Sequence, residues 1–274
     1  MSGQLFPKWT NKTPPLIAAG LVVLLVYVGF LVYYGGSPYT QQVGYQPVQP
    51  MPFSHALHAG ELGLDCRYCH NTVEVGDRAA VPPTQTCLNC HNDTSNIWPR
   101  RLDEDDPASG WEDEYDSLAP LREAAEAGRP IEWVRVHDLP DFAYFNHASH
   151  VAAGVGCDTC HGRVDHMDIV YQAEPMSMAW CLECHREPER HLRPPEEVTN
   201  MHYEVELREM VELYRLERFD EIRDPDVREI LADMEAEGVA LTAENLQYQR
   251  GLNLKRARNI QDATFMTDCS TCHR

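Results

Sequence analysis

The sequence predicts a mostly irregular and α-helical fold that lacks the hydrophobic core of an ordinary globular domain. Ten cysteines fall into five identical C-x-x-C-H motifs. The 274 residues include 19 prolines but only seven phenylalanines and five tryptophans, and no segment has the alternating pattern of a β-strand. A chain of this composition needs another source of buried surface, and the five motifs indicate what supplies it.

C-x-x-C-H is the attachment spacing of haem c. The two thiols join the vinyl groups of the porphyrin, and the histidine that follows binds the iron from the proximal side. Numbered in chain order, motifs 1 to 5 are Cys66–His70, Cys87–His91, Cys157–His161, Cys181–His185 and Cys269–His273. The predicted attachment residues are Cys66, Cys69, Cys87, Cys90, Cys157, Cys160, Cys181, Cys184, Cys269 and Cys272. The predicted proximal ligands are His70, His91, His161, His185 and His273. We therefore expect five haem c groups, whose porphyrins form the core of this region.

Other uses of cysteine fit the pattern less well. Zinc sites usually take two C-x-x-C pairs per metal, and five pairs cannot be shared evenly. A disulfide framework would not confine every cysteine to one spacing. A thioredoxin-like redox motif needs a single pair within an α/β pattern.

An uncharged apolar run from Leu16 to Tyr34 predicts a single transmembrane helix. At about 1.5 Å per residue, this run matches a hydrocarbon core of roughly 30 Å. Lys8 and Lys12 precede it, so residues 1–15 are expected in the cytoplasm of a bacterium and the haem-binding part on the periplasmic side of the inner membrane. A cleaved signal peptide is the alternative, but its apolar region is normally shorter and is followed by a small-residue cleavage site.

The charge of the chain is strongly acidic, with a formal net charge of −20. All 43 acidic residues follow residue 60, together with all but two of the 23 basic residues. This balance excludes nucleic acid as an expected partner. It leaves open whether the acidity favours a partner with a basic docking face or only keeps the protein soluble.

The order of motifs predicts two copies of a dihaem module. Phe53-Ser-His55-Ala-Leu-His58 precedes motifs 1 and 2, and Phe145-Asn-His147-Ala-Ser-His150 precedes motifs 3 and 4. The expected segments are a cytoplasmic N-terminus (1–15), an anchor (16–34), a stalk (35–52), module 1 (53–92), an acidic insert (93–136), module 2 (137–192), a helical segment (193–262) and the fifth attachment site (263–274).

Helical periodicity marks the segment after module 2. Apolar residues recur at helical spacing in two stripes, Leu207, Met210, Val211 and Tyr214, and then Val227, Ile230, Leu231 and Met234. Asp224-Pro225 predicts the start of the second helix, and Gly238 predicts its end. A shorter amphipathic helix is expected between Ser117 and Ala127. We expect the two stripes to pack on protein rather than on haem.

The second axial ligand of each iron decides between electron transfer and catalysis, because only an open position lets a substrate bind. The histidines outside the motifs are His55, His58, His137, His147, His150, His166, His191 and His202. Pair 1 (His55 and His58) and pair 2 (His147 and His150) recur at the same place in both modules, so all four are predicted distal ligands. Imidazoles three residues apart on a helical turn diverge by roughly 60°, so each pair can serve two irons.

The fifth distal ligand is predicted to be Met178, three residues before Cys181. A thioether is a soft donor, and a His/Met haem has a higher potential than a bis-histidine haem. His137 is the main alternative, followed by His166 and His202. Packing against a porphyrin face is the other expected use of methionine here.

The F-x-H-x-x-H arrangement before C-x-x-C-H resembles the class III multihaem cytochromes, the c3- and c7-like proteins. This resemblance implies that the first histidine of each pair serves the haem of the motif that follows it. His55 would then share an iron with His70, and His147 with His161, while the second histidine of each pair reaches a different haem.

Over residues 15–190 the chain is more similar to the pentahaem c subunit of alternative complex III, a bacterial quinol oxidoreductase. Pro52-Phe53-Ser-His55, Ile131 to Phe142 (I-E-W-V-R-V-H-D-L-P-D-F), Phe145-Asn-His147, Met178-Ala-Trp-Cys181 and the late motif 5 contribute to the likeness. Residues 200–262 contribute nothing to it. The resemblance implies an electron relay that takes electrons from an iron–sulfur subunit and passes them to a monohaem cytochrome, beside integral membrane subunits.

We therefore expect an electron-transfer subunit with no catalytic residues of its own, in a membrane quinol:acceptor oxidoreductase. One alternative is a stand-alone, membrane-anchored quinol dehydrogenase that feeds periplasmic reductases. Another is a multihaem reductase of a small oxyanion. The reductase is disfavoured because such enzymes often carry C-x-x-C-K, which does not occur here, and because the spare histidines outnumber the vacant positions.

Overall fold

The computed structural model describes residues 7–37, 40–92 and 118–273. The chain divides into two compact units, Met1–Gly44 and Tyr45–Arg274. The described residues are helical or irregular and contain no β-strand, only an isolated bridge between Val155 and Leu192. The start of the predicted cytoplasmic N-terminus and the acidic stretch 103–116 lie outside the described residues.

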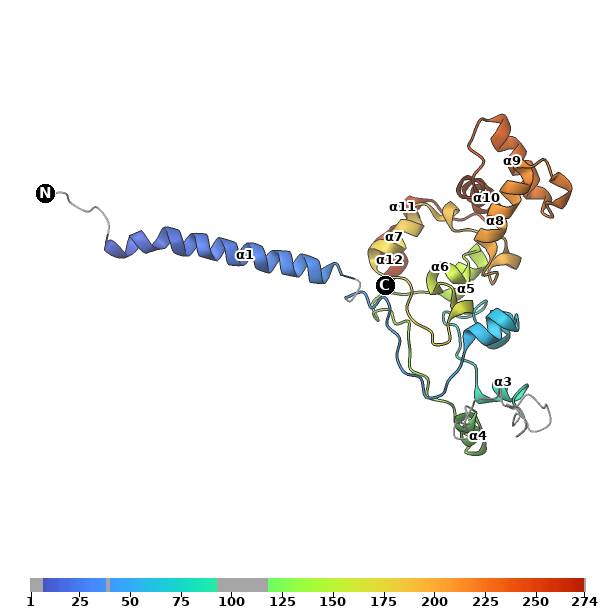
Figure 1. Ribbon diagram of the computed structural model, residues 1–274, viewed down its shortest axis with the longest axis horizontal. Coiled ribbons are helices and arrows are strands. Elements are labelled where there is room, and N and C mark those ends of the chain that lie inside the picture. The colour runs from blue at the N-terminus through green and yellow to red at the C-terminus, as the bar shows by residue number, and fades with distance from the viewer. Residues whose placement is uncertain (1–6, 38–39, 93–117, 274) are drawn as a thin grey trace, which may run out of the picture. The chain divides into compact units, whose positions relative to one another are not determined.

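The first unit consists mainly of α1, Thr13–Gly35, preceded by the short 3-10 helix η1, Lys8–Lys12 (Figure 1). Both prolines of Thr-Pro-Pro lie in the first turn of α1, where a missing N–H costs no hydrogen bond. Its most apolar stretch has a mean hydropathy of 2.6, and none of its residues is buried. Within the described ranges it is the one helix long and apolar enough to cross a membrane, and it contains the predicted run 16–34.

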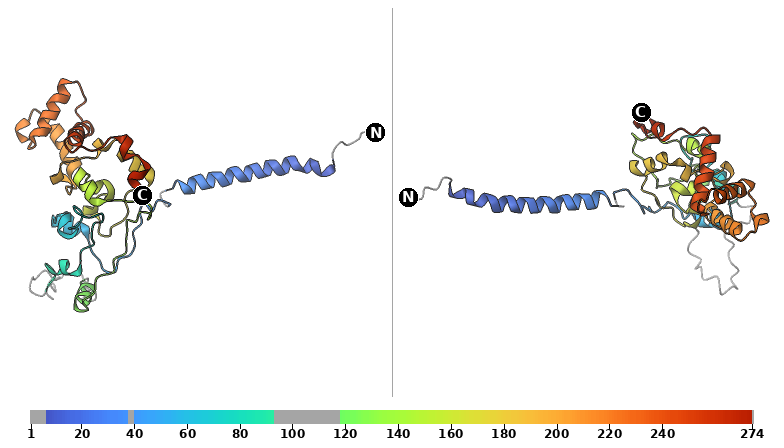
Figure 2. Two further views of the ribbon diagram at one scale, coloured as in Figure 1. Left: turned by 180° about the vertical axis from the view of Figure 1, so that it is seen from behind. Right: turned by 90° about the horizontal axis from the view of Figure 1, so that it is seen from above.

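The helices of the second unit are short, except for three longer helices, α8, α9 and α10, between residues 203 and 257 (Figures 1 and 2). They are η2 Ala56–Glu61 (a π-helix), α2 Cys66–Cys69, α3 Thr84–Leu88, α4 Ala119–Glu126, α5 His147–Ala153, α6 Cys157–His161, η3 Val164–His166, α7 Met178–Arg186, η4 Pro188–Arg190, η5 Pro195–Glu197, α8 Tyr203–Arg215, η6 Phe219–Glu221, α9 Pro225–Ala236, α10 Ala243–Ala257, α11 Ala263–Met266 and α12 Cys269–Cys272.

Short helices carry the C-x-x-C-H motifs, and three of them begin at a side-chain cap. The carboxylates of Asp65 and Asp268 accept backbone N–H bonds at the starts of α2 and α12, and the Ser177 hydroxyl does so at the start of α7. A cap of this kind satisfies a backbone donor that the first turn leaves without a partner. The caps therefore fix the turn on which both cysteines of a motif lie.

Helices α8, α9 and α10 build an ordinary apolar core, contrary to the expectation that no part of the chain has one. They lie together in Figure 1, and the buried members of the cluster are Tyr203, Leu207, Val211, Ile222, Val227, Ile230, Leu231, Met234 and Leu246. The two predicted stripes thus pack on protein. Helix α9 begins after Asp224, whose side chain accepts backbone N–H bonds from Asp226 and Val227, and Gly238 follows its end with φ +72°.

The region that carries the motifs has a different interior. Among its described residues, the buried apolar ones are few and scattered, namely Met51, Leu121, Ala124, Val136, Met167, Leu192 and Val198. Large apolar side chains such as Leu62, Phe142 and Phe265 are instead exposed. Exposed apolar surface of this extent marks a place where another apolar body packs. Porphyrins attached at the motifs would cover it.

Residues 45–52, the second half of the predicted stalk, are bonded to the haem-motif region rather than standing apart from it. The Gln46 amide donates to the Ile169 carbonyl at 2.8 Å. The side chain of Gln49 makes two 3.0 Å hydrogen bonds with the backbone of Val134, donating one and accepting the other. Two segments more than 80 residues away in sequence therefore hold this stretch of chain.

The two predicted modules meet where η2 packs on η3. The Ala56 N–H donates to the Met167 carbonyl at 3.1 Å, and the Ser54 hydroxyl donates to Asp168 at 2.7 Å. A Cβ at Gly60 would lie 2.3 Å from the backbone oxygen of Asp165, so a residue with a side chain cannot occupy this position without moving one of the two segments.

Candidate haem-binding sites

The two F-x-H-x-x-H segments have almost the same local geometry. In pair 1, the Phe53 ring is stacked on the second histidine at 4.5 Å and lies edge-on to the first at 4.8 Å. In pair 2, Phe145 makes the corresponding contacts at 4.4 Å and 4.8 Å. Each phenylalanine therefore holds two imidazoles that point in different directions, although pair 1 lies at the start of a π-helix and pair 2 on an α-helix.

Three predicted distal histidines face a predicted proximal histidine at nearly the same distance. The ring centroids are 6.1 Å apart for His58 and His91, 6.2 Å for His150 and His185, and 6.4 Å for His147 and His161. An imidazole nitrogen binds a transition metal at about 2 Å, and the ring centre lies about 1 Å behind it, so two imidazoles on opposite sides of one metal have centres roughly 6 Å apart. The three pairs therefore fit one iron each.

Backbone carbonyls fix the direction of six of the candidate histidine ligands. In each case the Nδ1 atom lies 2.8–3.0 Å from a carbonyl oxygen, which can only accept, so Nδ1–H donates and Nε2 is left for metal. The contacts are His58 with Ser54, His70 with Ala80, His147 with Asp77, His150 with Asn146, His185 with Met266 and His273 with Phe142.

Burial keeps several of these imidazoles neutral, which is the form that binds iron. Burial, followed by the nearby histidines, lowers the pKa of His161 to about 3. Burial and then His70 lower the pKa of His55 to about 4. The pKa values of His91 and His150 are also lowered, again chiefly by burial. His70 is thus near enough to His55 to affect its pKa, and the pairing of these two histidines on one iron stays a prediction.

The two candidates for the fifth distal position differ in setting. Met178 is the first residue of α7, one turn before Cys181, and its side chain is 68% exposed. His137 is largely enclosed, and its ring meets that of His161 edge-on at 4.5 Å. His161 already has His147 opposite it, so His137 is not placed as a second ligand to the same iron. The exposed Met178 side chain is therefore free to contact a haem attached at the neighbouring motif 4.

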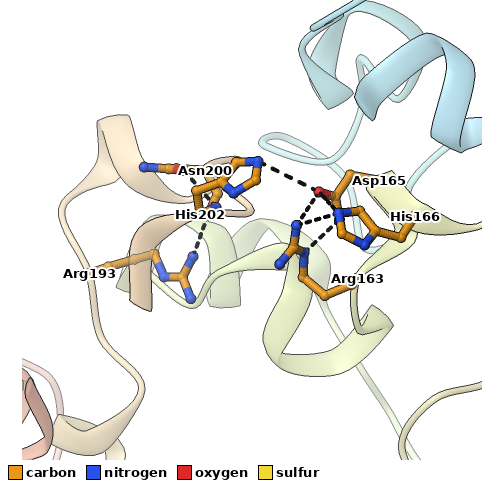
Figure 3. A network of polar contacts seen from close by, with 6 residues as sticks. All are labelled: Arg163, Asp165, His166, Arg193, Asn200 and His202. Carbon is orange, nitrogen blue, oxygen red and sulfur yellow. Dashed lines mark hydrogen bonds and ion pairs between the residues drawn. The ribbon is translucent and has the colours of Figure 1, made fainter. Parts of the chain in front are cut away.

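His166 and His202, the lesser alternatives, gather around Asp165 instead (Figure 3). Arg163 donates two hydrogen bonds to the Asp165 carboxylate, at 2.7 and 2.6 Å, and holds its pKa below the usual range. The Nε2 atoms of the two histidines lie 3.5 and 3.9 Å from the same carboxylate. Their side chains are 66% and 62% exposed, so both belong to a surface polar network.

The cysteines do not form the sites of the competing interpretations. All ten lie within the described residues, and none forms a disulfide. Among the side chains that the structure describes, no three His, Cys, Asp or Glu residues converge to hold a metal ion. Burial raises the pKa of the Cys160 thiol to about 12 and that of the Cys184 thiol to about 11, so both are protonated thiols at neutral pH.

The sequence did not reveal the hydrogen-bond partners of the candidate histidine ligands, because these partners are main-chain carbonyls. The carbonyls of Asp77 and Ala80 orient two candidate ligands from different motifs, and those of Phe142 and Met266 orient two more. A backbone carbonyl is present at every residue, so no sequence signal distinguishes these positions.

No family model matches the chain. The chain is similar to a curated protein, the menaquinone reductase multiheme cytochrome c subunit of Nitratidesulfovibrio vulgaris (strain Hildenborough). The two are 28% identical over 195 residues, which is 63% of this chain and 80% of the relative. This likeness supports a multihaem c-type cytochrome. The relative is, by its name, a multihaem cytochrome c that forms one subunit of a menaquinone reductase.

Proposed function

We propose that the chain holds five c haems and relays electrons through them as one subunit of a membrane quinol oxidoreductase. The observation that carries this proposal is the placement of three histidine pairs with ring centres 6.1 to 6.4 Å apart, each pair made of a motif histidine and a histidine outside the motifs. Haem c supplies one-electron redox chemistry when bound.

In this proposal the motif cysteines hold the porphyrins and the motif histidines are the proximal ligands. The distal ligands are His55, His58, His147, His150 and Met178, with His137 as the alternative to Met178. Five filled distal positions leave no site for a small substrate, which favours relay over the reduction of an oxyanion.

The proposed place of the chain is the bacterial inner membrane, with α1 as the anchor and Tyr45–Arg274 on the periplasmic side. A single membrane helix gives little room for a quinol pocket, which usually lies between several elements. We therefore assign quinol chemistry to integral membrane subunits and relay to this chain. The likeness to the alternative complex III subunit suggests an iron–sulfur subunit and a monohaem cytochrome as neighbours.

Mild-detergent purification tests this role, with the complex and the separated chain compared for reduction by a quinol analogue. We expect rapid reduction of the haems in the complex and negligible reduction in the separated chain. Robust quinol oxidation by the separated chain would contradict the proposal and favour a stand-alone quinol dehydrogenase. Because the relative is a menaquinone reductase subunit, the complex should also be assayed for electron transfer from the reduced haems to a menaquinone analogue.

A further inference from the structure

We propose that the five haem sites form one unbranched chain in the order motif 2, motif 1, motif 3, motif 4, motif 5, and that electrons enter and leave at its two ends. This order differs from the order of the motifs in the sequence. The inference rests on the proposed function, which makes the bound groups haems. The spatial order of the sites rests on contacts between neighbouring motifs.

Motif 2 neighbours motif 1 through pair 1. The second histidine of the pair, His58, faces His91 of motif 2, whereas the first lies one turn earlier and interacts with His70 of motif 1. A side-chain contact joins the same two motifs, because the Asn89 amide donates to the Tyr68 hydroxyl at 3.2 Å. One turn of helix therefore connects the two sites.

Motif 1 neighbours motif 3 through the loop 76–80. The Ala80 carbonyl accepts the Nδ1–H of His70 at 2.9 Å, and the Asp77 carbonyl accepts that of His147 at 3.0 Å. The same short loop thus orients the proximal histidine of one site and the distal histidine of the other. The backbone N–H of His147 also donates to Asp77, at 3.1 Å.

A second contact joins these two motifs directly. The thiols of Cys66 and Cys157, the first cysteines of motifs 1 and 3, are near enough for each to shift the pKa of the other, lowering that of Cys66 and raising that of Cys157. The attachment points of the two porphyrins are therefore adjacent, and the junction between the predicted modules lies here.

Motif 3 neighbours motif 4 through α5, which carries both members of pair 2. His147 faces His161 of motif 3 at 6.4 Å, and His150, one turn later, faces His185 of motif 4 at 6.2 Å. This arrangement repeats the one that links motifs 2 and 1.

Motif 4 neighbours motif 5 through the end of the chain. The Met266 carbonyl, just before motif 5, accepts the Nδ1–H of His185 at 3.0 Å. The thiols of Cys181 and Cys272 are near enough to interact electrostatically. Motif 5 itself is held by the segment before pair 2, since the Phe142 carbonyl accepts the Nδ1–H of His273 at 2.9 Å.

The exposure of the cysteines independently marks the same two ends. Of the ten motif cysteines, Cys90 of motif 2 and Cys269 of motif 5 are exposed, and the other eight are partly enclosed. A redox partner needs an accessible haem edge, so the ends of the chain are where electrons can be exchanged. Motifs 1, 3 and 4 then serve as interior steps.

The positions of the five irons test the order. Anomalous scattering at the iron edge, from crystals of the haem-loaded protein, should give five peaks in which the shortest separations are 2 to 1, 1 to 3, 3 to 4 and 4 to 5. A motif 2 iron closer to motif 3 than to motif 1, or a branch at any iron, would overturn the order. Fewer than five peaks from fully matured protein would instead count against the proposed function.

Paired variants test the order in solution. Replacing a distal histidine by methionine raises the potential of that haem. That haem then takes an electron first and makes its nearest neighbours harder to reduce, an effect that weakens with separation. In EPR-monitored titrations, His147→Met should lower the potentials of the motif 1 and motif 4 haems, and His58→Met that of motif 1 alone. A lowered potential of the motif 5 haem in the His58→Met variant, or an unchanged motif 1 haem in that variant, would contradict the order.

Discussion

For six of the candidate histidine ligands, a main-chain carbonyl decides which nitrogen of the imidazole is left for the iron. A carbonyl cannot donate, so His58, His150 and His185 must present Nδ1–H to it and keep Nε2 for metal. The stacked phenylalanine of each F-x-H-x-x-H segment adds a second restraint on ring orientation. The coordination geometry is therefore prepared by the polypeptide.

Removal of one distal imidazole should open one coordination position. We expect His147→Ala to convert about one fifth of the iron from low to high spin, because its Nε2 is the proposed second ligand of the motif 3 iron. His202→Ala is the matched control, since His202 is exposed and interacts with Asp165. EPR of the oxidised protein measures both. An unchanged spectrum for His147→Ala would show that this residue is not a ligand.

The fifth distal position distinguishes Met178 from His137. We expect Met178→Ala to abolish the near-infrared methionine-to-iron absorption band of the oxidised protein and to add high-spin signal, because loss of the thioether empties one position. His137→Ala should leave that band in place. The reverse outcome, with high-spin iron only in the His137 variant, would assign the position to His137.

The candidate ligands differ in how far the sequence alone could predict them. Pair 1 and pair 2 could be found because each recurs in the same place before a C-x-x-C-H motif, and repetition is visible in one sequence. The pairing of His58 with His91 could not be derived, because it depends on which motif approaches the second histidine in space. The roles of the Asp77 and Ala80 carbonyls left no trace at all in the sequence.

At the scale of elements, α9 depends on a single side chain at its start. One oxygen of Asp224 accepts the first backbone N–H groups of the helix, and the other forms an ion pair with Arg250 of α10. Arg250 is only 7% exposed, so its charge has little water to stabilise it if the carboxylate is lost. Asp224 therefore links the cap of one helix to the packing of another.

Asp224→Ala should destabilise the helical core by at least about 1 kcal/mol, the usual cost of a lost N-cap, with a further loss from the unpaired Arg250. Asp224→Asn keeps the cap and removes only the charge, so its melting temperature should fall less. Far-UV circular dichroism during heating measures both variants. Haem absorption should be unchanged, since no candidate ligand belongs to this core. Equal melting temperatures for Asp224→Ala and the unaltered protein would contradict the role of the cap.

Helix α1 is predicted to remain in the mature protein as a membrane anchor. Deletion of residues 2–35, with an exported leader supplied in their place, should move the haem-containing chain from the membrane to the soluble fraction in cells that lack its partners, because no other described helix is apolar enough to span a membrane. Haem absorption should be retained. N-terminal sequencing of the native protein that began near Ser37 would instead identify the run as a cleaved signal peptide.

The helices whose apolar residues recur at helical spacing could be predicted from the sequence. The contacts between distant segments could not. The stripes of α8 and α9, and the Asp224-Pro225 and Gly238 boundaries, follow from residue types at fixed spacing. That the stripes build a core with α10 could not be read from a single helix. Residues 45–52 look like a stalk because Gly, Pro and Gln favour no element, and their hydrogen bonds go to distant segments.

At the scale of the molecule, two kinds of interior are joined in the second unit. The segment Tyr203–Ala257 is held by apolar side chains, whereas the motif region has few buried apolar residues and many open ones. The motif region lacks the buried surface that an ordinary domain of its length needs. Five porphyrins would supply that surface and the chain of redox sites together, so the fold and the proposed relay depend on the same groups.

The haem content of the intact protein tests this dependence most directly. Mass spectrometry of the mature chain should give the polypeptide plus five haems, and haem staining should persist after denaturation because the attachment is covalent. A mass with fewer than five haems after complete maturation, or with zinc in their place, would contradict the account.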